Sequence, residues 1–256
     1  METYRYFLNL AYNGASFHGW QLQKNAHSVQ SELEEALFYC LNKKAIKLTG
    51  AGRTDAGVHA RNYYAHFDHD EKLSNEDLNQ LVYHLNQILP ESIGVYGAFN
   101  VRADAHARFS ALSRTYKYYI CRDHDPFKAG ISYRLTIPLD IGKLQEASQM
   151  ILSYMDFTCF TKSGANTTSN ICTVYQSFWE QHGNMLVYQT RANRFLRNMV
   201  RAMVGTLIDI GKGRTSLEEF ANILEKGTRS DAGQSVPACG LFLENIDYPD
   251  DIKIIP

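Results

Sequence analysis

Arg53 and Asp55 lie in a glycine-rich stretch, Gly50–Gly57, and this pair of residues is well suited to chemistry. Glycines tolerate left-handed backbone and let another chain, or a ligand, approach closely. Two positions apart in an extended loop, the two side chains project to the same side. A carboxylate beside a cation stays ionised, as a nucleophile or general base requires. A turn in which Asp55 caps local backbone amides gives the same pattern, so the spacing leaves both interpretations open.

Positive charge gathers in two segments, although the formal net charge of the chain is only -1. Residues 100–122 and 189–214 contain eleven cations against two acids: Arg102, Arg108, Arg114, Lys117, Arg122, Arg191, Arg194, Arg197, Arg201, Lys212 and Arg214, with Asp104 and Asp209. Aromatic residues interleave with the first segment: Phe109, Tyr116, Tyr118 and Tyr119. Clustered cations neutralise phosphates and aromatic rings stack on bases, so this composition is typical of an RNA-contacting surface. Two solvated basic faces above core tyrosines have the same composition.

Three familiar site types do not fit. The stretch Gly205–Lys212 has five residues between its glycines where a phosphate loop needs four, and Gly213 stands where that loop needs Ser or Thr. Gly50, Gly52 and Gly57 miss the dinucleotide spacing. The histidines near 59–69 do not share one face of a strand, which argues against a metal site. No motif for a metal or an organic cofactor is present, so none is expected.

The composition is that of a folded globular protein. Apolar types make up 45% of the 256 residues and charged types 21%. No window approaches the roughly 18 uninterrupted apolar residues of a membrane helix, and the start of the chain does not resemble a signal peptide. The five cysteines form no C-x-x-C pair and are expected to be reduced. We therefore expect a cytoplasmic protein without a membrane segment.

Hydrophobic periodicity predicts an irregular mixture of strands and helices. Ser28 and Ser74 are typical helix N-caps. Strands are predicted at about 4–10, 45–48, 62–68, 94–101, 116–122, 172–179, 185–192 and 241–246, and helices at about 29–41, 75–89, 141–152, 195–210 and 216–225. On the helix expected near 195–210, Arg194, Arg197 and Arg201 have the spacing i, i+3 and i+7 of one cationic face.

The order of these elements favours an α+β fold. We expect two similar α+β halves, 1–110 with the Asp55 loop and 139–256 with the Arg-rich helix, joined by a strand and connection at 111–138. The sheet is expected to be mixed and mostly antiparallel, with helices packed on it.

Five collinear stretches together resemble the bacterial tRNA pseudouridine synthase A family, over about residues 5–248. They are Gly19-Trp-Gln-Leu-Gln23, Gly50-Ala-Gly-Arg-Thr-Asp-Ala-Gly-Val-His-Ala60, Ala107-Arg-Phe-Ser-Ala111 with Arg114-Thr-Tyr-Lys-Tyr118, Phe195 to Leu207, and Pro237-Ala-Cys-Gly-Leu241. The resemblance implies the pseudouridine-synthase fold, isomerisation of uridine at positions 38 to 40 of the tRNA anticodon stem-loop, no cofactor, and a homodimer that binds tRNA.

The resemblance also implies roles for single residues. Asp55 corresponds to the catalytic aspartate and Arg201 to the arginine that pairs with it. Arg53 corresponds to an arginine that displaces the target base, which a paired stem must extrude at a cost of a few kcal/mol. Tyr116 corresponds to a tyrosine that stacks on the uracil, with Tyr118 as a possible substitute two residues on. Leu241 corresponds to an apolar residue near the pocket, and Arg194 and Arg197 add charge to the proposed RNA face.

Some positions depart from the family pattern. Asn13, Ala105 and Cys172 stand where Asp, Phe and Arg are common, and Arg194 stands where Gly is common. The first three departures leave open which stem uridines and which tRNAs are preferred. Two other functions stay open: a non-catalytic RNA-binding module, and a carboxylate-dependent hydrolase, which would usually need a second acid such as Asp104 or Asp156.

Overall fold

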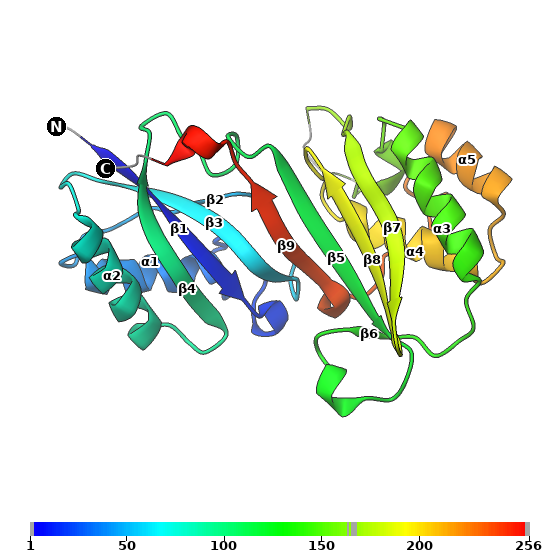
Figure 1. Ribbon diagram of the computed structural model, residues 1–256, viewed down its shortest axis with the longest axis horizontal. Coiled ribbons are helices and arrows are strands. Elements are labelled where there is room, and N and C mark those ends of the chain that lie inside the picture. Colours follow the sequence, from blue (N-terminus) through cyan, green and yellow to red (C-terminus); the bar gives the residue numbers. More distant parts are fainter. Residues whose placement is uncertain (1–2, 163, 165–167, 254–256) are drawn as a thin grey trace. The chain divides into compact units, whose positions relative to one another are not determined.

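The computed structural model describes residues 3–162, 164 and 168–253, and the chain packs into two compact units. The first comprises Met1–Leu112 together with Leu243–Pro256, and the second comprises Ser113–Phe242. Each has strands and helices of its own (Figure 1). The C-terminal segment thus packs with the N-terminal part of the chain.

Most strand pairs of the first unit are antiparallel. Its strands are β1 (Tyr4–Tyr12), β2 (Thr49–Gly50), β3 (His59–His69), β4 (Ile93–Val101) and β9 (Leu241–Asp247), of which the last begins in the other unit. The order is β4-β1-β3-β9. The short strand β2 pairs with β3 at His66 and Ala65. Leu8 on β1 faces Ala65 on β3 and Ala98 on β4, which fixes the register.

Two helices complete the first unit: α1 (Val29–Cys40) and α2 (Asn75–Ile88). They lie together beside β1 and β4 (Figure 1). Ser28 and Ser74 cap them as predicted, each in a capping box whose side chain accepts the third backbone N–H. The apolar stripes of both helices and alternate residues of β1 are buried and form the core: Tyr6, Leu8, Leu10, Leu33, Leu37, Leu81 and Leu85.

The second unit has strands β5 (Ser113–Cys121), β6 (Tyr133–Arg134), β7 (Val174–His182) and β8 (Met185–Ala192), and helices α3 (Ile141–Met150), α4 (Met199–Gly211) and α5 (Leu217–Lys226). Strands β5, β8 and β7 pair antiparallel in that order, and β6 pairs parallel with β5. The three helices gather beside β7 and β8 (Figure 1). Tyr188 of β8 is fully buried, and its hydroxyl lies 3.9 Å from the sulfur of Met203 on α4.

The predicted fold class is confirmed: α+β, with mixed but mostly antiparallel strand pairing and helices packed on the strands. One predicted strand, 45–48, is wrong, and the extended pair there is Thr49–Gly50. The backbone of Leu48 bonds to side chains instead of a strand: its N–H donates to Glu34 at 2.9 Å and its C=O accepts from Gln30 at 3.1 Å.

The helix predicted at 195–210 begins later, at Met199. Asn198 has a left-handed backbone (φ 65°), so the residues before it cannot continue the helix. Arg194 and Arg197 therefore precede the helix, and the predicted cationic helix face does not exist. Of the three arginines, only Arg201 is helical.

Three further features bear on function. No helix in the described ranges has both the length and the apolar character needed to cross a membrane. The five cysteines are free thiols. In the part of the chain that the structure describes, no group of three or more His, Cys, Asp or Glu side chains is arranged to hold a metal ion.

Candidate active site

The loop from Ala51 to Val58 connects β2 to β3 and presents both Arg53 and Asp55. Arg53 is exposed and Asp55 is half-buried. The Asp55 carbonyl accepts a hydrogen bond from Val58 N–H at 3.2 Å, and Gly57 closes this turn with φ 78°. The structure therefore places the two predicted residues together on one short, hydrogen-bonded loop.

Two glycines allow the segment between β1 and α1 to contact this loop closely. A Cβ on Gly14 would overlap the backbone of Val58, and one on Gly19 would overlap the Thr54 carbonyl. The Gly57 N–H also donates to the Phe17 carbonyl at 3.2 Å. The glycines at these positions are required for close backbone approach, and that approach fixes the loop.

An aromatic cluster supports the other side of the loop. Trp20 and Tyr63 lie with their ring centroids 4.2 Å apart, and Tyr12 meets Tyr63 edge-on at 5.6 Å. The Tyr63 hydroxyl donates to the Gly52 carbonyl at 2.5 Å, and Tyr12 hydrogen-bonds Thr54 at 2.9 Å. All three rings are at most 3% exposed. The backbone on both sides of Arg53 is thus tied to a rigid, buried platform.

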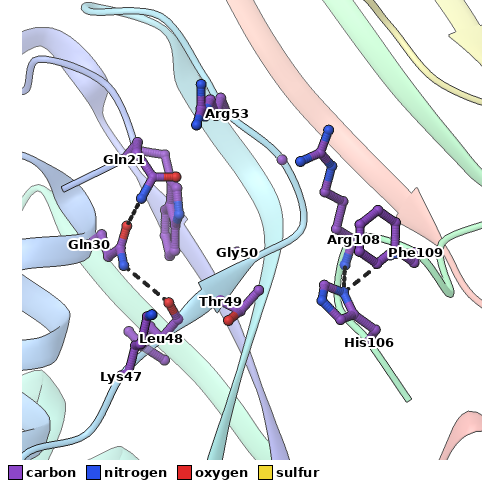
Figure 2. A pocket seen from close by; sticks show the side chains of 12 residues that line it. Gln21, Gln30, Lys47, Leu48, Thr49, Gly50, Arg53, His106, Arg108 and Phe109 are labelled. Atoms are coloured by element: carbon purple, nitrogen blue, oxygen red, sulfur yellow. Dashed lines mark hydrogen bonds between the residues drawn. The ribbon is translucent and has the colours of Figure 1, made fainter. Parts of the chain in front are cut away.

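A pocket of about 250 Å³ opens beside Arg53 within the same unit (Figure 2). One wall is the loop and the segment around Gln21, and the opposite wall is a turn at His106–Phe109. The described residues that line the pocket are Trp20, Gln21, Gln30, Lys47, Leu48, Thr49, Gly50, Gly52, Arg53, His106, Arg108 and Phe109. Three of them are cations and none is a carboxylate. Its charge suits an anion.

Buried hydrogen bonds fix the first wall of the pocket. Gln30 is 4% exposed, and its amide oxygen accepts from the Gln21 side chain at 2.8 Å and from Leu22 N–H at 3.0 Å. Its amide nitrogen donates to Glu34 and to the Leu48 carbonyl. A single glutamine therefore joins α1, the Gln21 segment and the start of β2. The Gly19–Gln23 motif marks this region in the sequence, but nothing in the sequence indicates the role of Gln30.

Two histidines fix the opposite wall. Nδ1 of His66 accepts from Ala107 N–H at 3.1 Å, and Nδ1 of His106 accepts from Arg108 N–H at 3.1 Å. Their rings meet edge-on at 4.7 Å. Burial, followed by the nearby Arg5, lowers the pKa of His66 to about 4, and burial together with Arg5 and Arg108 also lowers the pKa of His106. Both rings are therefore neutral at pH 7 and accept hydrogen bonds. The predicted non-metal role of His66 is consistent with these contacts.

In the second unit, β5 carries both candidate stacking tyrosines. Tyr116 is half-buried and meets Phe195 edge-on at 5.1 Å. Tyr118 is fully buried, its hydroxyl donates to the Pro237 carbonyl at 2.8 Å, and burial raises its pKa. A Cβ on Gly240 would overlap the Tyr118 ring, so Gly240 packs directly against this tyrosine. Only Tyr116 has ring surface that a base could reach.

Arg201 lies in the first turn of α4 and is half-buried. Its Nε donates to the Val236 carbonyl at 2.8 Å, and Val236 N–H donates back to the Arg201 carbonyl at 3.2 Å. This reciprocal pair holds the stem of the arginine against the segment before Leu241. Leu241 is 6% exposed at the start of β9.

The other two predicted arginines lie on the irregular segment between β8 and α4. Arg194 is half-buried and Arg197 is exposed. Lys162 N–H donates to the Arg197 carbonyl at 3.2 Å, and Leu196 N–H lies 3.5 Å from the Met199 sulfur. The backbone of this segment is anchored by these contacts.

Comparison with known proteins gives consistent matches. A family model described as tRNA pseudouridine synthase matches residues 147–249. A tRNA pseudouridine synthase A from Parabacteroides distasonis is 46% identical over 248 residues, which cover 97% of both chains. Relatives of the same name from Bacteroides fragilis and Bacteroides thetaiotaomicron are each 45% identical, covering 98% and 97% of this chain and 99% and 92% of their own.

The chain belongs to the tRNA pseudouridine synthase A family. The resemblance noted from five short stretches is thus confirmed over almost the full length. The family model covers only the C-terminal part of the chain, whereas the full-length relatives also span the Asp55 loop.

Proposed function

We propose that this protein isomerises uridine to pseudouridine at positions 38, 39 and 40 of the tRNA anticodon stem-loop. Membership of the tRNA pseudouridine synthase A family supports the reaction and the substrate class. The observation that carries the proposal is the loop at residues 51–58, which holds a half-buried carboxylate and an exposed arginine on a rigid support.

The reaction rearranges one nucleotide without adding or removing mass. The bond between ribose C1′ and uracil N1 breaks, the uracil turns, C1′ bonds to C5, and the proton on C5 leaves while N1 gains one. We assign Asp55 as the carboxylate that assists these steps. Attack on the sugar, attack on the base and removal of the C2′ proton each use an ionised carboxylate in this place.

Two arginines and two other side chains complete the proposed site. Arg53 displaces the target base from the stem, which offsets part of the cost of extrusion. Tyr116 stacks on the uracil, and Leu241 provides apolar surface near it. Arg201 pairs with Asp55 and keeps it ionised. Tyr118 has no exposed ring surface, so the stacking role falls to Tyr116.

The surroundings of the site bind the rest of the RNA. Arg194 and Arg197 contact phosphates from the irregular segment before α4, and the exposed Arg197 has the greater reach. We further propose that the protein acts in the cytoplasm, as a homodimer, without a metal or organic cofactor.

A map of pseudouridine on unmodified tRNA transcripts tests this function. Carbodiimide labelling followed by primer extension should give stops at one or more of positions 38–40 after treatment with the wild type, and none with Asp55→Asn. Stops elsewhere would refute the proposed positions. Binding without any stop would indicate a non-catalytic RNA-binding module, and release of free uracil would indicate a hydrolase.

A further inference from the structure

Apart from Arg53, the residues that line the pocket take no part in the proposed reaction, yet the pocket is cationic and built on fixed walls (Figure 2). Lys47, Arg53 and Arg108 contribute positive charge, and no carboxylate lines it within the described part of the chain. Neither Lys47 nor Arg53 has an ion-pair partner among the described residues. Such a site attracts an anion rather than a neutral ligand.

The side chains around the pocket are preorganised on two sides. The Gln30 hydrogen bonds hold Leu48 next to Lys47, and the His106 ring holds the backbone of Arg108. The Arg108 guanidinium also lies over the Phe109 ring, 5.5 Å from its centroid. Phe109 is 75% exposed, so this pair lies at the open rim of the pocket. An anion would therefore meet cations whose backbone positions are already set.

The position of the pocket limits which anion it takes. Arg53 lines it, and Asp55 follows two residues later on the same loop. Two residues span at most about 7 Å of extended chain. A phosphate held beside Arg53 while a ribose lies at Asp55 would therefore belong to the target nucleotide or to a close neighbour.

We propose that this pocket binds one phosphodiester group of the RNA strand, within two nucleotides of the target uridine, through Lys47 and Arg108. The inference rests on the proposed function, because it assumes that Asp55 engages the target ribose or base. Charge-assisted contacts of this kind position the strand and carry no sequence information. The pocket would hold the backbone in place while Arg53 displaces the base.

The test measures whether removing one protein side chain cancels the effect of removing the charge of one phosphate. Stem-loop RNAs carry one uncharged methylphosphonate linkage at each position within three nucleotides of the target. Their Kd is measured in an Asp55→Asn background, with and without Lys47→Ala, so that no RNA is converted. Lys72→Ala is the matched control, because Lys72 is an exposed lysine of the same unit that does not line the pocket.

We expect one linkage near the target at which loss of charge weakens binding about three- to tenfold. In the Lys47→Ala variant, the loss of affinity caused by that linkage should fall below about twofold. The Arg108→Gln variant should reduce it likewise at the same linkage, whereas the Lys72→Ala control should leave it unchanged. Equal losses with and without Lys47→Ala at every linkage would overturn the proposal, as would coupling of Lys47 and Arg108 to different linkages. This experiment measures binding alone, so a negative result would not bear on the pseudouridine map. Conversely, a negative map would not change the interpretation of these Kd values.

Discussion

Two regions with proposed roles, the loop at residues 51–58 and the segment at residues 193–201, are built differently. The loop is held by backbone contacts through glycines and by hydroxyls of buried aromatic residues. The second segment is irregular, and Asn198 gives it a left-handed turn before α4 begins. Chemistry needs a carboxylate held in one place, whereas attraction of a phosphate needs only a positive charge at the surface. The difference agrees with the proposed roles: Asp55 of the first region takes part in the reaction, and Arg194 and Arg197 of the second contribute affinity.

The largest effect is expected from Gly50→Ala, which disrupts the packing of the aromatic cluster against the loop. A Cβ there would overlap both the Trp20 indole and the Tyr63 hydroxyl, so we expect a loss of about 3 kcal/mol in the free energy of unfolding. Gly52→Ala, two residues further on, is the matched control, because its Cβ would meet nothing within 4 Å. Urea titration of both variants gives the comparison. Equal stability of the two would show that this close approach does not hold the loop.

An intermediate effect is expected from His66, the buried histidine that accepts a hydrogen bond from the turn at His106–Phe109. The pKa of His66 is about 4 in the folded protein and near 6.5 when unfolded, so between these values the unfolded chain binds a proton that the folded one does not. His66 should therefore lower the free energy of unfolding as pH falls, by about 2 kcal/mol between pH 7 and pH 5.

The variant His66→Asn separates this contribution, since an amide oxygen still accepts from Ala107 N–H and does not titrate. Its unfolding free energy, measured by urea titration at pH 7, 6 and 5, should fall less steeply than that of the wild type. If the unfolding free energies of the variant and the wild type fell equally with pH, His66 would not be the source of the acid sensitivity. His182→Asn is a suitable control, because His182 is exposed.

The smallest effect is expected from Arg197→Ala in the second region. Loss of one phosphate contact should weaken tRNA binding by less than about 1 kcal/mol and reduce the slope of log Kobs against log salt by about 0.7–0.9. Stability and turnover at saturating tRNA should stay unchanged. Lys226→Ala is the control, since Lys226 is an exposed cation of the same unit, lies outside the two basic segments and is near Glu225. An unchanged slope would remove Arg197 from the RNA surface.

Local signals predicted much of this structure. Ser28 and Ser74 mark the starts of α1 and α2 because capping is decided within four residues. Of the glycines around Asp55, Gly57 has the left-handed backbone that glycine allows, whereas the close backbone approach to this loop occurs at Gly14 and Gly19. The left-handed Asn198 was not predictable, since the apolar pattern of 195–210 continues through it.

The interactions that the sequence did not reveal are those between distant positions. His66 and Ala107 are 41 residues apart, and Gln30 and Leu48 are 18 apart. The return of the described residues 243–253 to the first unit likewise depends on strand pairing between distant parts of the chain. Local periodicity carries no information about such partners, so the walls of the pocket emerged only from the structure.

The most direct test of the central claim uses tRNA transcripts labelled with tritium at C5 of uridine. Formation of the C1′–C5 bond must release this label to water, whereas binding releases none. With wild type and Asp55→Asn compared at enzyme concentrations above Kd, we predict rapid release by the wild type and at least a thousandfold slower release by the variant, with tRNA affinity kept within about tenfold. Release by Asp55→Asn at a comparable rate would contradict the assignment of the reaction to the loop at residues 51–58.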